Sequence, residues 1–478
     1  MAIASRFELH HRDLRDFREG LGIAQRHVRN LAYVFVVYSI FKWVLPASKQ
    51  ASRPEFEFWS SSRIAHELPP LIEAAYVATD DDELRLDPPP GMLRWMLSPP
   101  GMRDELQVGI GVRGEAQLIG FVAAVPSALC LRGERHQAAV EVSLLCLRRQ
   151  WRGQGLTRVL LEELRRRCDA AGVQLAVYTA SRPRRVCPLL RAACFHRPLL
   201  AKALLETAFL RAEARDDAAD PNEAAAAEEQ TSITAAEVRK ALYEAARLPQ
   251  PLRRTPSSPR LRRMRADDAF ECLALSDEHA RAFALAHSFS MAQFRHRFLG
   301  RGAISLVLRG RPRQSRHRWL FWRRRSNGQG SGGGHGGGGG DAGSGGADGG
   351  GGTGAGGGGP LLGFISFTLL PLRSTSGKRL VQAQLLGLAL SPNAPTEDTL
   401  ERLVDGALRT ARGAGAAVFN ALAVGDLSPA RLAALGFAQG DGETFVHVEH
   451  SGAVDAADAP REPQTIDPSA VSWTPMLS

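Results

Sequence analysis

Residues 141–180 constrain the fold most, because they predict a strand, a glycine-bearing turn, an amphipathic helix and a second strand in that order. Residues 141–147 are largely apolar, as expected of a strand that is buried on both faces. Apolar residues at three- and four-residue spacing then predict one buried helix face, and Gly172 is suited to end that helix. This face consists of Leu156, Val159, Leu160 and Leu164. Such a β-α-β unit predicts an α/β protein.

The turn between the first strand and the helix has the composition of an anion site. Gly153 and Gly155 leave backbone N–H groups uncovered where the helix begins, and the helix dipole favours negative charge there. We expect side chains at these two positions to block the approach of a pyrophosphate. Two interpretations stay open, an acyl-CoA pyrophosphate site and an ordinary turn with a solvated arginine face. The first predicts that the pyrophosphate is bound by Arg148, Arg149, Arg152, Gly153, Gln154, Gly155 and Leu156.

Two short signatures, roughly three hundred residues apart, resemble those of the N-myristoyltransferase family. E-V-S-L-L-C-L-R-R at residues 141–149 is similar to the family's E-I-N-F-L-C-x-H-K, and G-F-A-Q-G-D-G at residues 436–442 is similar to its K-F-G-x-G-D-G. The chain therefore resembles a divergent glycylpeptide N-tetradecanoyltransferase. The resemblance implies an α/β fold of two pseudo-symmetric halves like GNAT acyl-CoA N-acyltransferases, with mixed sheets flanked by helices. Residues 385–422 support the repeat, since they have the same strand, helix and strand layout without the glycine-arginine turn.

The resemblance also implies how acyl transfer would be catalysed. The transition state needs hydrogen-bond donors for its oxyanion, and in the family these are backbone amides at the positions of Leu144 and Leu145, where the strand is irregular. The proton acceptor in the family is the chain's own C-terminal carboxylate, which here is that of Ser478. Glu141 is the alternative base, and a plain strand-edge carboxylate is its other interpretation.

The implied cosubstrate is myristoyl-CoA, and no metal is expected. Phe58 and Trp59 match an aromatic stretch that family members lay across the CoA moiety. Their alternative role is to pack onto the core.

The resemblance implies that the other substrate is a protein or peptide with an N-terminal glycine. Residues 76–87 resemble a mobile loop over the family's peptide groove, and a plain solvated acidic loop is the alternative. Thr179 would hydrogen-bond the substrate amine, and His196 would help form the peptide pocket; alone, they read as an ordinary strand residue and a lone histidine. The expected peptide-binding residues are Tyr76, Asp80, Asp81, Asp82, Ser143, Thr179, His196 and Asn420.

Several positions depart from the family pattern. Ser143 replaces an asparagine near the substrate amine, and Ala423 replaces an aspartate. Two alternative functions therefore stay open beside N-myristoylation. One is a GNAT acetyltransferase that uses a short acyl-CoA, and the other is an inactive relative that acts as a binding module.

Composition changes divide the chain. Residues 1–53 are poorly readable, and residues 54–210 are predicted to form the acyl-CoA half. Residues 211–233 read as a linker or insertion, because they are charged and alanine-rich without an apolar period. Residues 234–478 are predicted to form the peptide half, which is interrupted by a flexible arginine- and glycine-rich insertion over residues 309–359.

The net charge of +10 comes from arginine, which reflects compositional bias rather than nucleic-acid binding. The six cysteines form no CxxC pair, so we expect free thiols in the reducing cytoplasm. Residues 31–47 are apolar but shorter than the ~20 residues of a bilayer span, so we expect a helix that packs on the domain or on a membrane surface. We expect a monomer, and peripheral association with membranes or ribosomes stays open.

Overall fold

The structure is a computed structural model that describes residues 54–76, 84–136, 138–182, 186–207, 235–250, 258–311, 359–450 and 465–476. The elements below belong to the unit that begins at Phe56. The predictions for residues 1–53, Asp80, Asp81, Asp82, residues 211–233, most of the 309–359 insertion and Ser478 lie outside the described residues.

The predicted β-α-β unit is present. Its elements are β7 (Ala139–Leu147), α4 (Leu156–Ala170) and β8 (Leu175–Ala180). β7 and β8 are parallel, as the helical crossover between them requires. Gly172, with a φ of +72°, lies in the turn that leads from α4 to β8.

A second parallel unit follows the predicted layout of residues 385–422. It consists of β14 (Arg379–Leu390), α10 (Thr396–Gly413) and β15 (Val418–Leu422). β14 and β15 are parallel neighbours, like β7 and β8. The α/β class with mixed pairing and flanking helices is therefore confirmed.

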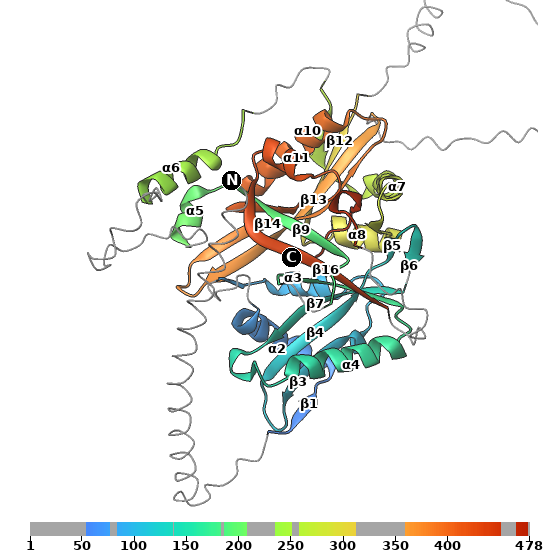
Figure 1. Ribbon diagram of the computed structural model, residues 1–478, viewed down its shortest axis with the longest axis vertical. Coiled ribbons are helices and arrows are strands. Elements are labelled where there is room, and N and C mark those ends of the chain that lie inside the picture. The colour runs from blue at the N-terminus through green and yellow to red at the C-terminus, as the bar shows by residue number, and fades with distance from the viewer. Residues whose placement is uncertain are drawn as a thin grey trace, which may run out of the picture. The chain divides into compact units, whose positions relative to one another are not determined.

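One large mixed sheet contains the strands of both β-α-β units (Figure 1). Its path is β1, β3, β4, β7, β8, β16, β9, β15, β14, β13, β12 and β10, and β2 pairs with β13 off this path. β16 lies between β8 and β9, and β9 pairs with β15, so strands from the two halves of the sequence alternate at the centre of the sheet. The remaining bounds are β1 (Phe56–Phe58), β2 (Leu84–Leu86), β3 (Gln107–Val112), β4 (Leu118–Pro126), β9 (Leu190–Pro198), β10 (Arg260–Arg263), β12 (Ala303–Arg309), β13 (Leu361–Ser374) and β16 (Ala438–His450).

Helices cover both faces of the first half of the sheet. α2 (Ser61–Ala75) shares a core cluster with Leu118 and Phe121 of β4, whereas α4 shares another with Ile119 and Val122. Because neighbouring strand residues point to opposite faces, the two helices pack on opposite sides. The other helices are α3 (Pro90–Leu97), α5 (Ala201–Glu206), α6 (Ala235–Ala245), α7 (Ala269–Ala280), α8 (Met291–Leu299) and α11 (Pro429–Ala434).

A small second sheet consists of β11 (Leu285–His287), β5 (Leu129–Leu131) and β6 (Glu134–His136). Short 3-10 turns lie at Asp104–Leu106, Arg149–Trp151, Ala266–Asp268 and Pro468–Ala470. All six cysteines are free, and Cys187 is the exposed one. Within the described ranges, no helix is long and apolar enough to cross a membrane.

Candidate functional site

β7 is interrupted by a β-bulge at Leu144 and Leu145. On β4, Phe121 pairs with Cys146 and Ala123 pairs with Ser143, so Val122 alone faces two β7 residues. Leu144 has a φ of +56°, which is uncommon for a residue with a branched apolar side chain. This conformation turns the backbone out of the regular ladder at the two positions expected to donate to an oxyanion.

The neighbouring strand also leaves β7 at this point. The parallel pairing of β7 with β8 ends at Val142 and Tyr178, although β7 continues to Leu147. Neither β4 nor β8 therefore gives Leu144 and Leu145 a partner in register. The regular register of β7 is therefore interrupted at the two positions that the sequence predicts as oxyanion donors.

The glycine turn follows directly. Gly153 and Gly155 have φ of +77° and +79°, and no heavy atom lies within 4 Å of a Cβ placed at either residue. Their conformation, rather than crowding by the protein, therefore requires glycine. No backbone carbonyl of the described chain accepts from the N–H groups of Gly153, Gln154 or Gly155. The open space and these N–H groups lie where α4 begins, the arrangement that suits a phosphate.

Two arginines of the turn, Arg148 and Arg152, donate hydrogen bonds to backbone carbonyls of the protein. Arg148 Nε donates to Leu118 O at 2.8 Å. Arg152 donates to two carbonyls, from Nε to Leu147 O at 3.1 Å and from Nη2 to Ala75 O at 2.9 Å. These bonds tie the turn to β4 and to the end of α2, so both side chains have a structural role besides any contribution of charge.

Phe58 and Trp59 differ in their surroundings: Trp59 packs on the core, whereas Phe58 is exposed. Trp59 is buried, and a Cβ at Gly111 would lie 2.4 Å from its Nε1, so Gly111 makes room for the indole. The Arg63 guanidinium lies 3.6 Å from the centroid of this ring. Phe58 is 42% exposed and is the member of the pair that a ligand could contact. Sequence alone left this division open.

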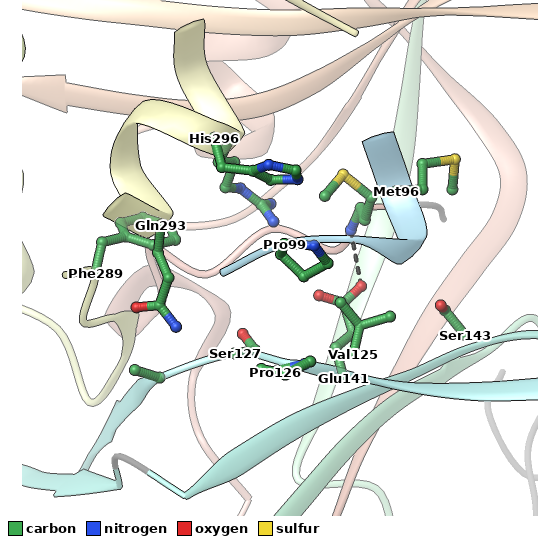
Figure 2. Close-up of a pocket in the computed structure, with 13 residues that line it drawn as sticks. Met96, Pro99, Val125, Pro126, Ser127, Glu141, Ser143, Phe289, Gln293 and His296 are labelled. Atoms are coloured by element: carbon green, nitrogen blue, oxygen red, sulfur yellow. Dashed lines mark hydrogen bonds between the residues drawn. The ribbon is translucent and has the colours of Figure 1, made fainter. Parts of the chain in front are cut away.

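A largely apolar pocket lies beside the bulge (Figure 2). Glu141 and Ser143 project into it from the same face of β7, since they are two residues apart. The rest of its wall comes from Met96, Pro99, Val125, Pro126, Ser127, Ala128, Phe289, Gln293, His296, Arg297 and Met476.

Glu141 is the buried acid of this pocket. Burial raises the pKa of Glu141 above its ordinary value, whereas the charge of Arg297 and the hydrogen bond from Met476 lower it. That bond runs from the Met476 backbone N–H to Glu141 Oε1 at 2.8 Å (Figure 2). Tyr76, which the sequence assigned to the peptide site, lies close enough for the charge of Glu141 to affect its pKa. Its pKa is raised to about 12, first by burial and then by the nearby Cys146 and Glu141.

His296 connects the two halves at the wall of the pocket. Its Nε2 donates to Trp95 O at 2.7 Å, and Trp95 Nε1 donates to His296 O at 2.8 Å. Burial lowers the pKa of His296, so the neutral ring that donates from Nε2 is favoured. This reciprocal pair holds α3 against α8.

The second group of predicted residues lies on the strands that interlock the halves. His196 Nδ1 and Asn420 Oδ1 are 2.9 Å apart, on paired strands β9 and β15. A Cβ at Gly440 would lie 2.3 Å from His196 Nε2, so the second signature supplies the glycine that this ring needs. Thr179 faces Val446 of β16 in register. The structure thus brings His196, Asn420 and Gly440 together, while Glu141, Ser143 and Met476 form a separate group.

Three site residues had no signal in the sequence. Arg297, His287 and Thr474 meet at the Thr474 carbonyl, which accepts from Arg297 Nη2 at 2.7 Å and from His287 Nε2 at 3.0 Å. Each residue is isolated in the sequence, and the contact forms only in the folded chain. Across the parts of the chain that the structure describes, no cluster of three or more His, Cys, Asp or Glu residues could hold a metal ion.

Residues 54–188 match the model of the N-terminal domain of myristoyl-CoA:protein N-myristoyltransferase. Over these residues the chain is similar to the N-myristoyltransferase family. The glycylpeptide N-tetradecanoyltransferase of Drosophila melanogaster is 30% identical over 240 residues, which are 50% of this chain and 45% of that protein. The enzyme of the same name from Eremothecium gossypii is 28% identical over 232 residues, or 48% and 45% of the two chains. The chain thus spans about half the length of these N-myristoyltransferase relatives.

The fold agrees over a longer stretch. Saccharomyces cerevisiae N-myristoyltransferase with bound myristoyl-CoA superposes with a TM-score of 0.62 at 21% identity, covering 89% of this chain and 92% of that chain. The predicted architecture is therefore that of a solved N-myristoyltransferase.

Proposed function

We propose that this protein transfers a myristoyl group from myristoyl-CoA to the N-terminal glycine amine of a protein or peptide. The observation that carries the proposal is the bulge at Leu144 and Leu145, one short turn before the open N–H groups of Gly153 and Gly155. A donor site for an oxyanion and a site for a pyrophosphate are thus on one β-α-β unit. The match of residues 54–188 to the family's N-terminal domain supports the same reaction.

The reaction places definite demands on this chain. The glycine amine attacks the thioester carbonyl carbon, a C–N bond forms, the C–S bond breaks and CoA leaves as the thiol. The oxyanion that develops would accept from the backbone N–H groups of Leu144 and Leu145. The amine has a pKa near ~8, so a carboxylate can accept its proton without a large shift in its own pKa. In this proposal the acceptor is the α-carboxylate of Ser478.

Substrate binding is divided between the two groups of residues. The pyrophosphate would lie at Gly153, Gln154 and Gly155 with positive charge from Arg148, Arg149 and Arg152, and Phe58 would contact the CoA moiety. The peptide would contact Tyr76, Ser143, Thr179, His196 and Asn420, with Asp80, Asp81 and Asp82 selecting a basic residue. We place the reaction in the cytoplasm, where the free thiols would stay reduced.

Calorimetry with myristoyl-CoA and acetyl-CoA side by side tests the choice of donor. Each methylene that the protein buries adds ~0.8 kcal/mol, so myristoyl-CoA should bind far more tightly. Equal affinities would contradict a long-chain donor and support the short-chain acetyltransferase instead.

A further inference from the structure

The last described residues of the chain pack in the interior of the protein and end at the wall of the pocket. Val471 forms a parallel bridge with Leu285, and the Ser472 N–H donates to Leu285 O at 2.9 Å. Trp473 follows and is 1% exposed, within a core cluster that also contains Leu285 and Val446. The segment Val471–Met476, called the tail below, is therefore fixed in the interior up to the pocket of Figure 2.

The second β-α-β unit holds the tail through a bulge of its own. On β13, Ser366 pairs with Gly387 and Phe367 pairs with Leu385, so Leu386 is the extra residue of β14. The Leu386 carbonyl accepts from Thr474 Oγ1 at 2.6 Å and from Arg297 Nη2 at 3.3 Å. Both units thus interrupt their first strand, but the second interruption is occupied by the protein's own tail.

Arg297 completes this attachment. Its guanidinium donates to the Thr474 carbonyl at 2.7 Å, and the side chain is 6% exposed. Burial lowers the pKa of Arg297, and the charge of Glu141 opposes that shift. A buried cation persists where hydrogen bonds and an opposite charge compensate for its lost hydration. Here those partners are the tail, Leu386 and Glu141.

Glu141 holds the tail from the other side. Its Oε1 accepts from the Met476 N–H at 2.8 Å, and Glu141 lies three residues before Leu144 on β7. The tail is therefore attached to the same strand that carries the bulge at Leu144 and Leu145.

We propose that Glu141 and Arg297 are positioning residues that clamp the tail between the two β-bulges and hold Met476 on the strand that carries Leu144 and Leu145. Glu141 then acts as a hydrogen-bond acceptor for Met476 rather than as the base of the reaction. The catalytic consequence rests on the proposed acyl transfer, whereas the clamp itself does not. The two are therefore tested by separate measurements on the full chain.

Two substitutions of Glu141 separate the roles. Glu141→Gln keeps an oxygen that can accept from Met476, whereas Glu141→Ala removes it. We expect Glu141→Ala to speed amide exchange in residues 474–476 and to lower kcat at least 100-fold without changing the affinity for myristoyl-CoA, since small misplacements near reacting groups carry such costs. Glu141→Gln should restore wild-type exchange and recover at least ten-fold of the lost kcat. Arg297→Met should speed exchange at the same residues.

Asp268→Ala is the control for a general loss of stability. Asp268 is a buried carboxylate bound by Arg262 and Arg309, away from the tail. The Asp268→Ala substitution should destabilise the fold without selectively speeding amide exchange at residues 474–476. A Glu141→Gln variant with normal exchange but the full loss of kcat would assign the base to Glu141 and overturn the positioning role. Unchanged exchange in both Glu141→Ala and Arg297→Met would overturn the clamp. If the wild type transfers no acyl group, the proposed function fails, and exchange still decides the clamp.

Discussion

Leu144 lies opposite Val122 in the β-bulge between β7 and β4, and its φ of +56° is held in a strand that is otherwise regular. Glycine adopts such a φ freely, but leucine does so at a cost of ~1–2 kcal/mol. The buried side chain of Leu144 and the pairing on either side compensate for this cost. Backbone strain of this kind often marks a functional position.

Leu144→Val should be more harmful than Leu145→Val. A β-branched side chain is disfavoured at a positive φ but suits a strand. We expect Leu144→Val to lower the free energy of unfolding by ~1–3 kcal/mol more than Leu145→Val, and to lower kcat because the oxyanion donors move. Urea unfolding and steady-state kinetics measure the two effects. Similar losses in both variants would show that the bulge conformation is not essential.

Gly155→Asp should weaken binding of every CoA thioester alike, by at least ~10-fold, because it places negative charge where a phosphate is expected. Gly377→Asp is the matched control, since Gly377 has a φ of +82° and equally open surroundings but lies in the β13–β14 turn. Calorimetry with free CoA separates the pyrophosphate from the acyl chain. Equal affinities in both variants would indicate that the glycine turn is only structural.

Glu163 should stabilise α4 in a pH-dependent way. Hydrogen bonds from Arg166 and then Arg167 lower the pKa of Glu163 to about 2. Because the unfolded chain binds the proton more readily, this stability is present above pH ~4.5 and is lost as the pH falls towards 2. Glu163→Gln should lower the free energy of unfolding by ~1–2 kcal/mol at pH 7, and the difference from wild type should shrink below pH 4.

The exposed Glu162 provides the control, since its partner Arg158 is also exposed. Glu162→Gln should change stability by less than ~0.5 kcal/mol at either pH. A Glu163→Gln effect that is independent of pH would exclude an ionic origin.

Deletion of residues 327–358 should leave the melting temperature unchanged or slightly raised. The sequence predicts a flexible insertion there, and each doubling of a loop costs only ~0.6 kcal/mol. The flanking strands β12 and β13 pair directly, and Gly310 N donates to Pro360 O at 2.8 Å. Gly359 is kept because its carbonyl accepts from Arg309. A marked fall in the melting temperature would show that the deleted tract packs on the protein.

Local patterns predicted the two β-α-β units well. Apolar spacing located α4, and the second predicted helix, from about Thr399 to Arg412, lies within the observed Thr396–Gly413. The glycines at positions 153, 155 and 172 likewise predicted turns at the two ends of α4, and φ is positive at all three. Helix periodicity and backbone conformation are local properties, so they can be inferred from sequence.

The tertiary arrangement was harder to infer. Nothing local indicates that β16 inserts between β8 and β9, or that Arg297 contacts Thr474 across 177 residues of chain. Such contacts depend on which strands become neighbours. The expectation that side chains at Gly153 and Gly155 would block a pyrophosphate stays a prediction; the structure adds that the space there is open and that φ is positive at both residues.

The most direct test of the account is acyl transfer itself. The full chain is incubated with myristoyl-CoA and a glycine-initiated peptide, and the peptide mass is followed together with release of the CoA thiol. We predict a mass gain of one myristoyl group on the free amine, with one thiol released per acylated peptide, and no gain on the same peptide with a blocked N-terminus. Tight binding of myristoyl-CoA without any acylated peptide would contradict the proposed enzyme and identify the protein as a binding module.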